Sequence, residues 1–238
     1  MRGFYFLLAM LFLIPKDALA MHIADGVIPF GQVIFWFVAL FVALIPSLYK
    51  LSKTLKEAPE KKAVFGLATA LIFLLSMLPI PVPFAGTCAH PVGVSIAVML
   101  FGLTGGIVSG FIVIILQAFL LAHGGVSSIG ANAFSMAVVG SFTAYVLLAL
   151  FRNTNLSLLF VGFLMGLFSD WATYLTTAIQ LSLALAGENP FSAIFAKAIL
   201  AFLPTQIPIG ILEGLLAGSI AQALAKRRKD LFAWEVKK

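Results

Sequence analysis

This 238-residue sequence contains three histidines, His22, His90 and His123, and their imidazoles are its foremost candidates for metal binding. His22 follows Met21, and a Met-His pair at a free amino terminus is a strong chelating unit. The α-amine, the amide nitrogen of His22 and its imidazole can close two fused rings on one metal ion, and an imidazole from elsewhere would complete four nitrogens. Such planar nitrogen donors favour nickel(II) or copper(II). Metal and protons compete for these atoms, so capture depends on pH.

The chelate requires Met21 to be the first residue of the working chain. A basic start, a short apolar stretch over residues 4–14 and an A-x-A pattern that ends at Ala20 are typical of a signal peptide. The stretch is too short to cross a bilayer comfortably. We therefore predict a signal peptide over 1–20 and a mature chain over 21–238. Initiation at Met21 would leave the same first residue, whereas an uncleaved anchor would not.

The other two histidines lie in segments punctuated by glycine and proline. His90 belongs to residues 85–93, which open a predicted span. Irregular backbone near membrane depth is tolerated where it is buried in protein or lines a cavity, so His90 is either a ligand or a capping residue. Cys88 is either a soft ligand or a small packing residue. We expect His123, together with Asn132, to orient a ligand from a second shell.

Composition places the chain in a membrane. It is 62% hydrophobic and only 10% charged, so it needs lipid as its solvent. The net charge of +6 does not indicate nucleic-acid binding, because the basic residues lie in short loops and the tail. The single cysteine excludes a disulfide framework. We find no nucleophile–base arrangement, so no enzyme is predicted. No Gly-Lys dipeptide occurs, so any ATP hydrolysis belongs to another chain.

Seven apolar segments after Met21 predict an all-α membrane protein, a bundle of seven transmembrane helices. The third segment is short, and its junction with the fourth, near Gly102, is either a tight turn or a break. The last two segments repeat glycine at every fourth position, which lets helix backbones approach closely. The predicted helices cover residues 29–49, 63–80, 91–103, 105–122, 131–151, 156–186 and 193–225; the glycines are Gly162, Gly166, Gly210, Gly214 and Gly218.

Loop charges predict the orientation. Lysine and arginine gather in the connection 50–62, at Arg152 and in the tail from Lys226, whereas the loops on the opposite side contain neither. The positive-inside rule therefore places the mature amino terminus outside the plasma (inner) membrane and the tail in the cytoplasm. All three histidines then lie at the outer face.

Three ionisable residues fall within predicted spans, where such side chains are costly and usually paired or functional. We expect Asp170 to form an ion pair within the bundle, in preference to a metal relay. Lys197 is expected to snorkel near the outer end. Glu213 is expected toward the cytoplasmic end, where it would face a partner subunit.

Several motifs together resemble one known family. Residues 21–26 resemble the mature start of the CbiM/NikM substrate-capture subunits of energy-coupling factor (ECF) transporters, and 86–93 is similar to their second metal-binding segment. Residues 116–125, continuing through 130–136, match their most recognisable block. Gln206-Ile207-Pro208 and Glu213-Gly214 also fit, so the resemblance covers nearly the whole mature chain.

The resemblance implies a seven-helix fold that binds cobalt(II) or nickel(II) near the outside, as transported substrate and not as a cofactor. Carried over, the ligands are Met21, His22 and His90. The implied partners are a transmembrane coupling subunit, ATPase subunits and a small accessory membrane protein. The His-Pro form at His90 resembles the cobalt branch, linked to cobalamin synthesis. Val92 and Val94 depart from the Thr and Gly expected there, so nickel stays open.

Two other function classes stay in view. A stand-alone secondary carrier for a metal ion or an organic solute would use Asp170 and Glu213 for proton coupling. An intramembrane enzyme would need a reactive cluster, which we do not find in the sequence.

Overall fold

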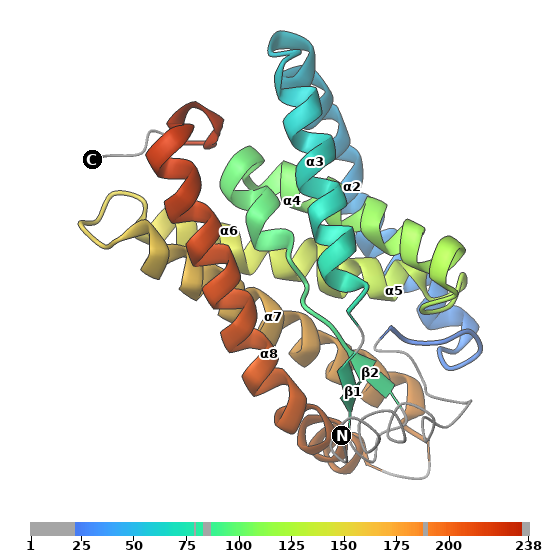
Figure 1. Cartoon of the computed structure of the whole chain (residues 1–238). Helices are drawn as coiled ribbons and strands as arrows, with labels where there is room; N and C mark the ends of the chain where they lie inside the picture. The colour runs from blue at the N-terminus through green and yellow to red at the C-terminus, as the bar shows by residue number, and fades with distance from the viewer. Residues whose placement is uncertain (1–21, 79, 83–86, 188–189, 235–238) are drawn as a thin grey trace, which may run out of the picture.

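The computed structural model describes residues 22–78, 80–82, 87–187 and 190–234, and these are almost entirely helical (Figure 1). The predicted signal peptide and Met21 lie outside the described residues. The helices are α2 (Phe30–Glu57), α3 (Lys61–Ser76), α4 (Val94–Leu121), α5 (Ile129–Ala133), the π-helix η1 (Phe134–Gly140), α6 (Ser141–Phe151), α7 (Leu158–Leu185), α8 (Phe191–Arg227) and the 3-10 turn η2 (Lys229–Leu231).

Five helices in the described part of the chain are long and apolar enough to cross a membrane. They are α2, α4, the continuous run α5–η1–α6, α7 and α8. Helix α3, with 16 residues, is shorter than the usual span of roughly 20. Large apolar side chains cover the outer surface, for example Phe30 and Val42, as expected where lipid is the solvent. The prediction of a helical membrane protein is therefore confirmed.

Helix α4 is broken at Gly102, which has φ 68° and ψ −166°. A positive φ is costly for residues with a Cβ, so glycine suits this position. The two arms pack antiparallel: a methyl group added at Gly106 would lie 2.4 Å from a Val98 methyl, and one at Gly110 would lie 3.0 Å from a Val94 methyl. The junction near Gly102, predicted to be either a tight turn or a break, is therefore a sharp reversal of the chain at this glycine. The first arm is too short to span a bilayer alone, so the described part of the chain does not contain the seven separate spanning helices that were predicted.

A small β-hairpin that the sequence analysis did not predict leads to His90. Strands β1 (Ile80–Val82) and β2 (Thr87–Ala89) pair antiparallel, with Ile80 opposite Ala89. Each strand has three residues, too few for a period-two pattern to be recognised. The hairpin also corrects the predicted helix over 63–80, which ends at Ser76. Prolines follow in this stretch, and proline disfavours helix continuation.

Helices α7 and α8 lie side by side (Figure 1), and glycine makes their contact possible. A methyl group at Gly166 would lie 2.8 Å from the Glu213 carbonyl oxygen. One at Gly162 would lie 2.7 Å from Gly218 Cα, and one at Gly214 would lie 2.6 Å from the Phe163 carbonyl oxygen. The predicted close approach is confirmed, and it occurs within this chain's own bundle.

Basic residues far apart in the sequence meet at one cavity. It has a volume of about 370 Å³, and its lining includes Lys50 from α2, Gly102 at the break in α4, and Arg152 and Trp234. Gly102 and the histidine segments lie at opposite ends of the α4 arms, so this basic cavity and the histidines are well separated.

Candidate metal centre

The three histidines come together in space from segments far apart in the sequence. His22 precedes α2, His90 follows β2 and His123 follows α4. Their ring centroids are 5.2 Å (His22–His90), 5.1 Å (His22–His123) and 5.4 Å (His90–His123) apart. One nitrogen from each ring can be chosen so that all lie within 4.8 Å of one another. The histidines predicted to share one face therefore form a single cluster that can hold a metal ion.

Gln117, on α4, connects two of these rings and was not predicted as a site residue. Its Oε1 lies 2.9 Å from His22 Nε2, and its Nε2 lies 3.1 Å from His90 Nε2. It is fully buried. The signal that could have identified it is a lone amide in an otherwise apolar span. Buried polar groups need hydrogen-bond partners, and here the partners are metal-binding imidazoles.

These contacts define which ring nitrogen carries the proton. An amide oxygen only accepts, so His22 Nε2 donates to Gln117 and the lone pair of His22 Nδ1 remains available. An amide nitrogen only donates, so His90 Nε2 accepts from Gln117. His90 Nδ1 then donates to the carbonyl oxygen of Pro91, 2.9 Å away. Each ring therefore keeps one basic nitrogen, as metal ligation requires.

Burial keeps the imidazoles neutral. It lowers the pKa of His90 to about 3, with a further lowering by His123, against a hydrogen bond to Pro91 that raises it. The pKa of His22 is well below its usual value, first because of burial and then because of His90 and His123. Burial also lowers the pKa of His123. Neutral imidazole is the form that binds metal ions, so at pH 7 protons on these rings compete little with a metal.

His123 is itself a member of the cluster and has a ring nitrogen that could bind a metal ion. Among the described residues, its buried Nε2 has no hydrogen-bond partner, and its ring meets His22 edge to face. It is therefore positioned to ligate as well as to orient a ligand. The second-shell role expected for it stays a prediction.

Asn132 supports the segment of His22 through the next residue. Its Oδ1 accepts from the backbone N–H of Ile23 at 2.9 Å, and its Nδ2 donates to the Ile23 carbonyl oxygen at 3.1 Å. Ser128 Oγ and the N–H of Gly125 also donate to this carbonyl. Asn132 thus fixes the backbone beside His22, and its side-chain hydrogen bonds in the described chain go to Ile23 and Ser128, which suits the supporting role expected for it.

The loop after His123 closes over the amino-terminal segment. Gly124 has φ 83°, and a methyl group there would lie 2.7 Å from His22 Cβ, so glycine permits both the turn and the approach. Asp25 accepts from the N–H and the hydroxyl of Ser127, at 2.7 and 2.5 Å, and from the N–H of Val126 at 3.1 Å. These bonds, first of all those from Ser127, lower the pKa of the Asp25 carboxyl.

The segment that carries His90 is held by residues from α7 and α8. The Tyr174 hydroxyl accepts from the N–H of His90 at 3.2 Å and lies 3.3 Å from the His90 carbonyl oxygen. Glu213 Oε2 accepts from the N–H of Val92 at 2.6 Å, and Oε1 accepts from the N–H of Gly93 at 2.8 Å. The expectation that Glu213 faces a partner subunit is therefore wrong. It is 2% exposed and points inward, because two backbone donors satisfy its carboxylate there.

The other predicted residues have different outcomes. Met21, the expected source of the terminal amine, lies outside the described residues, as does the side chain of Cys88, whose backbone pairs with Pro81. Asp170 is fully buried, and neither carboxylate oxygen has a hydrogen-bond partner in the described chain. The salt bridges there, Lys53–Glu57 and Arg228–Asp230, do not include Asp170, so the expected ion pair is absent. Lys197 is exposed, and the snorkelling expected for it stays a prediction.

Sequence comparison identifies close relatives along most of the chain. It is 39% identical over 211 residues to the cobalt transport protein CbiM of Sorangium cellulosum, which is 89% of this chain and 94% of that protein. It is 41% identical over 227 residues to the cobalt transport protein CbiM of Moorella thermoacetica, which is 95% of this chain and 87% of that protein. A similar protein from Geobacter sulfurreducens is 40% identical over 221 residues, and there the match spans 64% of the relative's length.

The fold has solved counterparts. A crystal structure of a transition metal transporter superposes with a TM-score of 0.76 at 24% identity, covering 86% of this chain and 92% of that one. The crystal structure of a truncated transition metal transporter superposes with a TM-score of 0.73, also at 24% sequence identity. These likenesses show the fold. The model of the family described as "Cobalt uptake substrate-specific transmembrane region" matches residues 22–231. The chain is thus a multi-pass membrane protein that belongs to the CbiM family.

Proposed function

We propose that this chain is the substrate-specific subunit of an ECF transporter, which captures cobalt(II), or nickel(II), at the outer face of the plasma membrane. The observation that carries the proposal is the cluster formed by His22, His90 and His123, with the Gln117 amide bonded to the rings of the first two. Neutral, buried imidazoles around one point suit a borderline divalent ion and not a hard cation such as magnesium. We favour cobalt because the relatives are named cobalt transport proteins. Cobalamin synthesis as the consumer of the metal follows from the family resemblance.

The proposed ligands are the amine of Met21, the amide nitrogen and Nδ1 of His22, and Nε2 of His90. A compact chelate ring with its own amide requires Nδ1 of His22, and the hydrogen bond from His22 Nε2 to Gln117 leaves that nitrogen unprotonated. The amide proton leaves when the metal binds, so capture weakens as pH falls. For His90 to ligate, Gln117 must give up its bond to Nε2.

The proposal includes a cleaved peptide over residues 1–20 and an external mature amino terminus. The cavity that gathers Lys50 and Arg152 supports this orientation, because basic residues favour the cytoplasmic side. The sequence has no Gly-Lys dipeptide of a phosphate-binding loop, so ATP hydrolysis is assigned to separate ATPase subunits. The family resemblance adds a transmembrane coupling subunit and a small accessory membrane protein to the proposed transporter.

The position of the amino terminus provides the test. One glycine added before Met21 of the purified mature chain moves the amine and displaces His22 from position two. We expect cobalt affinity, measured by isothermal titration calorimetry, to fall by more than about 100-fold, since losing ligands costs more than losing an outer-shell partner. His22→Ala should reduce cobalt affinity to a similar extent. The matched control adds the glycine after Lys238 and should bind normally. Unchanged affinity in the amino-terminal extension, or residues 1–20 still attached by mass spectrometry, would overturn the chelate.

One observation favours a second candidate, a stand-alone secondary carrier. Asp170 is buried within α7 without a hydrogen-bond partner in the described chain, and unpaired intramembrane carboxyls occur in proton relays. Cobalt uptake into proteoliposomes separates the two candidates. The ECF proposal expects uptake only with the coupling and ATPase subunits and ATP. Uptake by the isolated chain under a proton gradient, lost in Asp170→Asn, would favour the carrier.

A further inference from the structure

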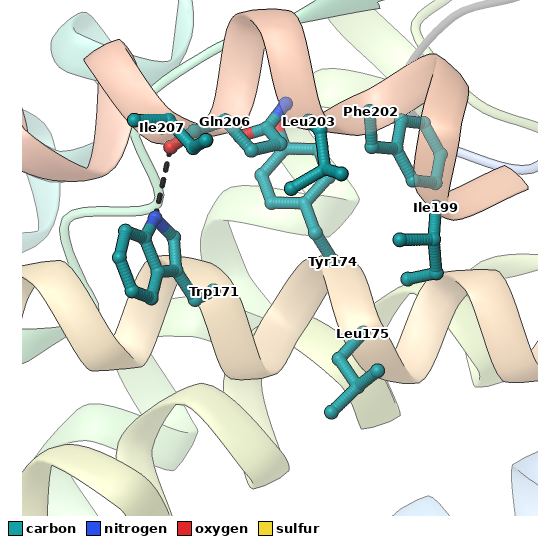
Figure 2. Close-up of a pocket in the computed structure, with 8 residues that line it drawn as sticks. All are labelled: Trp171, Tyr174, Leu175, Ile199, Phe202, Leu203, Gln206 and Ile207. Atoms are coloured by element: carbon teal, nitrogen blue, oxygen red, sulfur yellow. Dashed lines mark hydrogen bonds between the residues drawn. The ribbon is translucent and has the colours of Figure 1, made fainter.

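The backbone around His90 is held by two helices that supply no metal ligand. Tyr174 reaches from α7 toward α8, as Figure 2 shows, and its hydroxyl bonds to both the N–H and the carbonyl oxygen of His90. Glu213, on α8, accepts from the next two free backbone donors, those of Val92 and Gly93. Pro91, between them, has no N–H to offer. Every backbone donor from His90 to Gly93 therefore bonds to α7 or α8.

The carboxylate of Glu213 matches its surroundings because it offers two acceptor oxygens to two backbone N–H groups. It is buried in the membrane-spanning part of α8, and the salt bridges in the described chain do not include it. Its two oxygens bind two adjacent N–H groups at 2.6 and 2.8 Å, immediately before α4 begins at Val94. Bonds of this kind to a charged acceptor are stronger than neutral ones. The positive end of the helix dipole adds to them.

Helix α8 is itself tightly fixed to α7. Their backbones touch at Gly162 with Gly218 and at Gly166 with Gly214, and the Trp171 indole donates to the Gln206 carbonyl oxygen at 2.9 Å (Figure 2). Beside this bond lies an apolar pocket of about 310 Å³ between the helices, which includes one face of Tyr174. A displacement of α8 would therefore move Glu213 together with its neighbours on α7.

We propose that Glu213 is a positioning residue that ties the His90 segment to helix α8, so that the geometry of the metal site and the position of the α7–α8 pair are set together. This inference rests on the proposed function. A shift of α8 by about 1 Å would lengthen both short bonds beyond the usual range unless the His90 segment moved with it. Because coupling between two sites is reciprocal, metal bound at His90 must equally favour one position of α8.

Glu213→Gln is the discriminating variant. It keeps the shape but has one acceptor oxygen, so one backbone N–H faces an amide donor. In the purified mature chain, we expect cobalt affinity to fall by about 10–100-fold, the usual effect of losing an outer-shell partner. The visible spectrum of bound cobalt should change, because His90 is displaced. Thr177→Val, a buried change on α7 whose hydroxyl bonds only to its own helix, should have neither effect.

A double-mutant cycle separates positioning from general damage. If Glu213 acts through His90, then Glu213→Gln should cause no further loss in His90→Ala. An equal loss in both backgrounds, or wild-type affinity and spectrum in Glu213→Gln, would overturn the proposal. If Glu213→Gln does not fold, Glu213→Asp, which keeps the charge but shortens the reach, takes its place in the same cycle. Should His22→Ala and His90→Ala both bind cobalt normally, the proposed function fails, and that result is distinct from a failure at Glu213 alone.

Amide hydrogen exchange tests the link to α8 directly. In the wild-type chain, cobalt should slow exchange at Val92 and Gly93 and also in α8 around Glu213. In Glu213→Gln, cobalt should slow exchange in α8 less than it does in the wild-type chain, because only Tyr174 and one amide oxygen still connect the His90 segment to the α7–α8 pair. Equal protection of α8 by cobalt in both proteins would contradict the proposed link.

Discussion

Gln117 has two consequences for the metal centre, and they act in opposite directions. It orients His22 so that Nδ1 stays basic, which favours binding. It also uses the lone pair of His90 Nε2, which a metal ion needs. A net hydrogen bond contributes about 0.5–1.5 kcal/mol. With the proposed ligands, the bond to His22 would persist when metal binds, whereas the bond to His90 would be exchanged for a stronger metal bond, so we expect orientation to dominate.

Gln117→Ala should therefore weaken cobalt binding by roughly 10-fold, the equivalent of one to two lost hydrogen bonds. Calorimetry on the mature chain measures this change. Gln32→Ala is a suitable control, because the exposed Gln32 amide donates to the Leu183 carbonyl and not to a histidine. Tighter binding in Gln117→Ala would show that Gln117 chiefly competes with the metal for His90.

At the scale of elements, the α7–α8 pair depends on backbone contact. Moving an apolar side chain from lipid into a helix interface yields little hydrophobic free energy, because lipid is itself apolar. Close packing between the helices therefore drives their association. A methyl group at Gly218 would lie 2.2 Å from the Leu159 carbonyl oxygen, and the backbone cannot yield as a flexible side chain does. The same contact places Glu213 where it can reach the His90 segment.

Gly218→Ala should accordingly destabilise the protein by about 1–3 kcal/mol, the usual cost of overpacking. For a chain of this size, each kcal/mol corresponds to about 2–4 °C in Tm. Thermal unfolding of the detergent-purified protein provides the measurement. Gly66→Ala is the matched control, because nothing lies within 4 Å of the added methyl group. A Tm for Gly218→Ala equal to that of the control would mean that the helices separate easily at this position.

At the scale of the whole molecule, the two ends differ in chemistry. One end gathers three neutral imidazoles and acidic Asp25, and the other gathers Lys50 and Arg152. This asymmetry matches the positive-inside rule. It predicts that a metal ion meets the histidine end from outside the cell.

Cysteine labelling tests the orientation. In a Cys88→Ala background, which removes the single native cysteine, Val126→Cys should react with a membrane-impermeant maleimide in spheroplasts. Lys53→Cys should react only after the membrane is permeabilised. Val126 is 51% exposed and the Lys53 side chain 70% exposed, so both thiols are accessible from their own side. The opposite labelling pattern would invert the proposed topology.

Hydropathy determined the membrane class and most of the spans, because burial in lipid requires apolar residues that are continuous along the chain. The break near Gly102 was also visible locally, since a cluster of glycines indicates a backbone that bends or packs closely. The two short strands and the end of α3 at Ser76 were not predicted, because proline-rich connections of a few residues have no recognisable periodicity.

The histidines could be identified from the sequence as candidate metal ligands, because imidazole is rare in an apolar chain and the chain contains only these three. Their meeting point depended on the tertiary structure. The His22–Gln117 bond joins residues 95 apart, and the Glu213–Val92 bond joins residues 121 apart. No local pattern encodes such distances, since hydrogen bonds between segments exist only after the helices have packed. The sequence by itself thus determined which atoms can bind a metal, and only the packed helices decided which other side chains orient them.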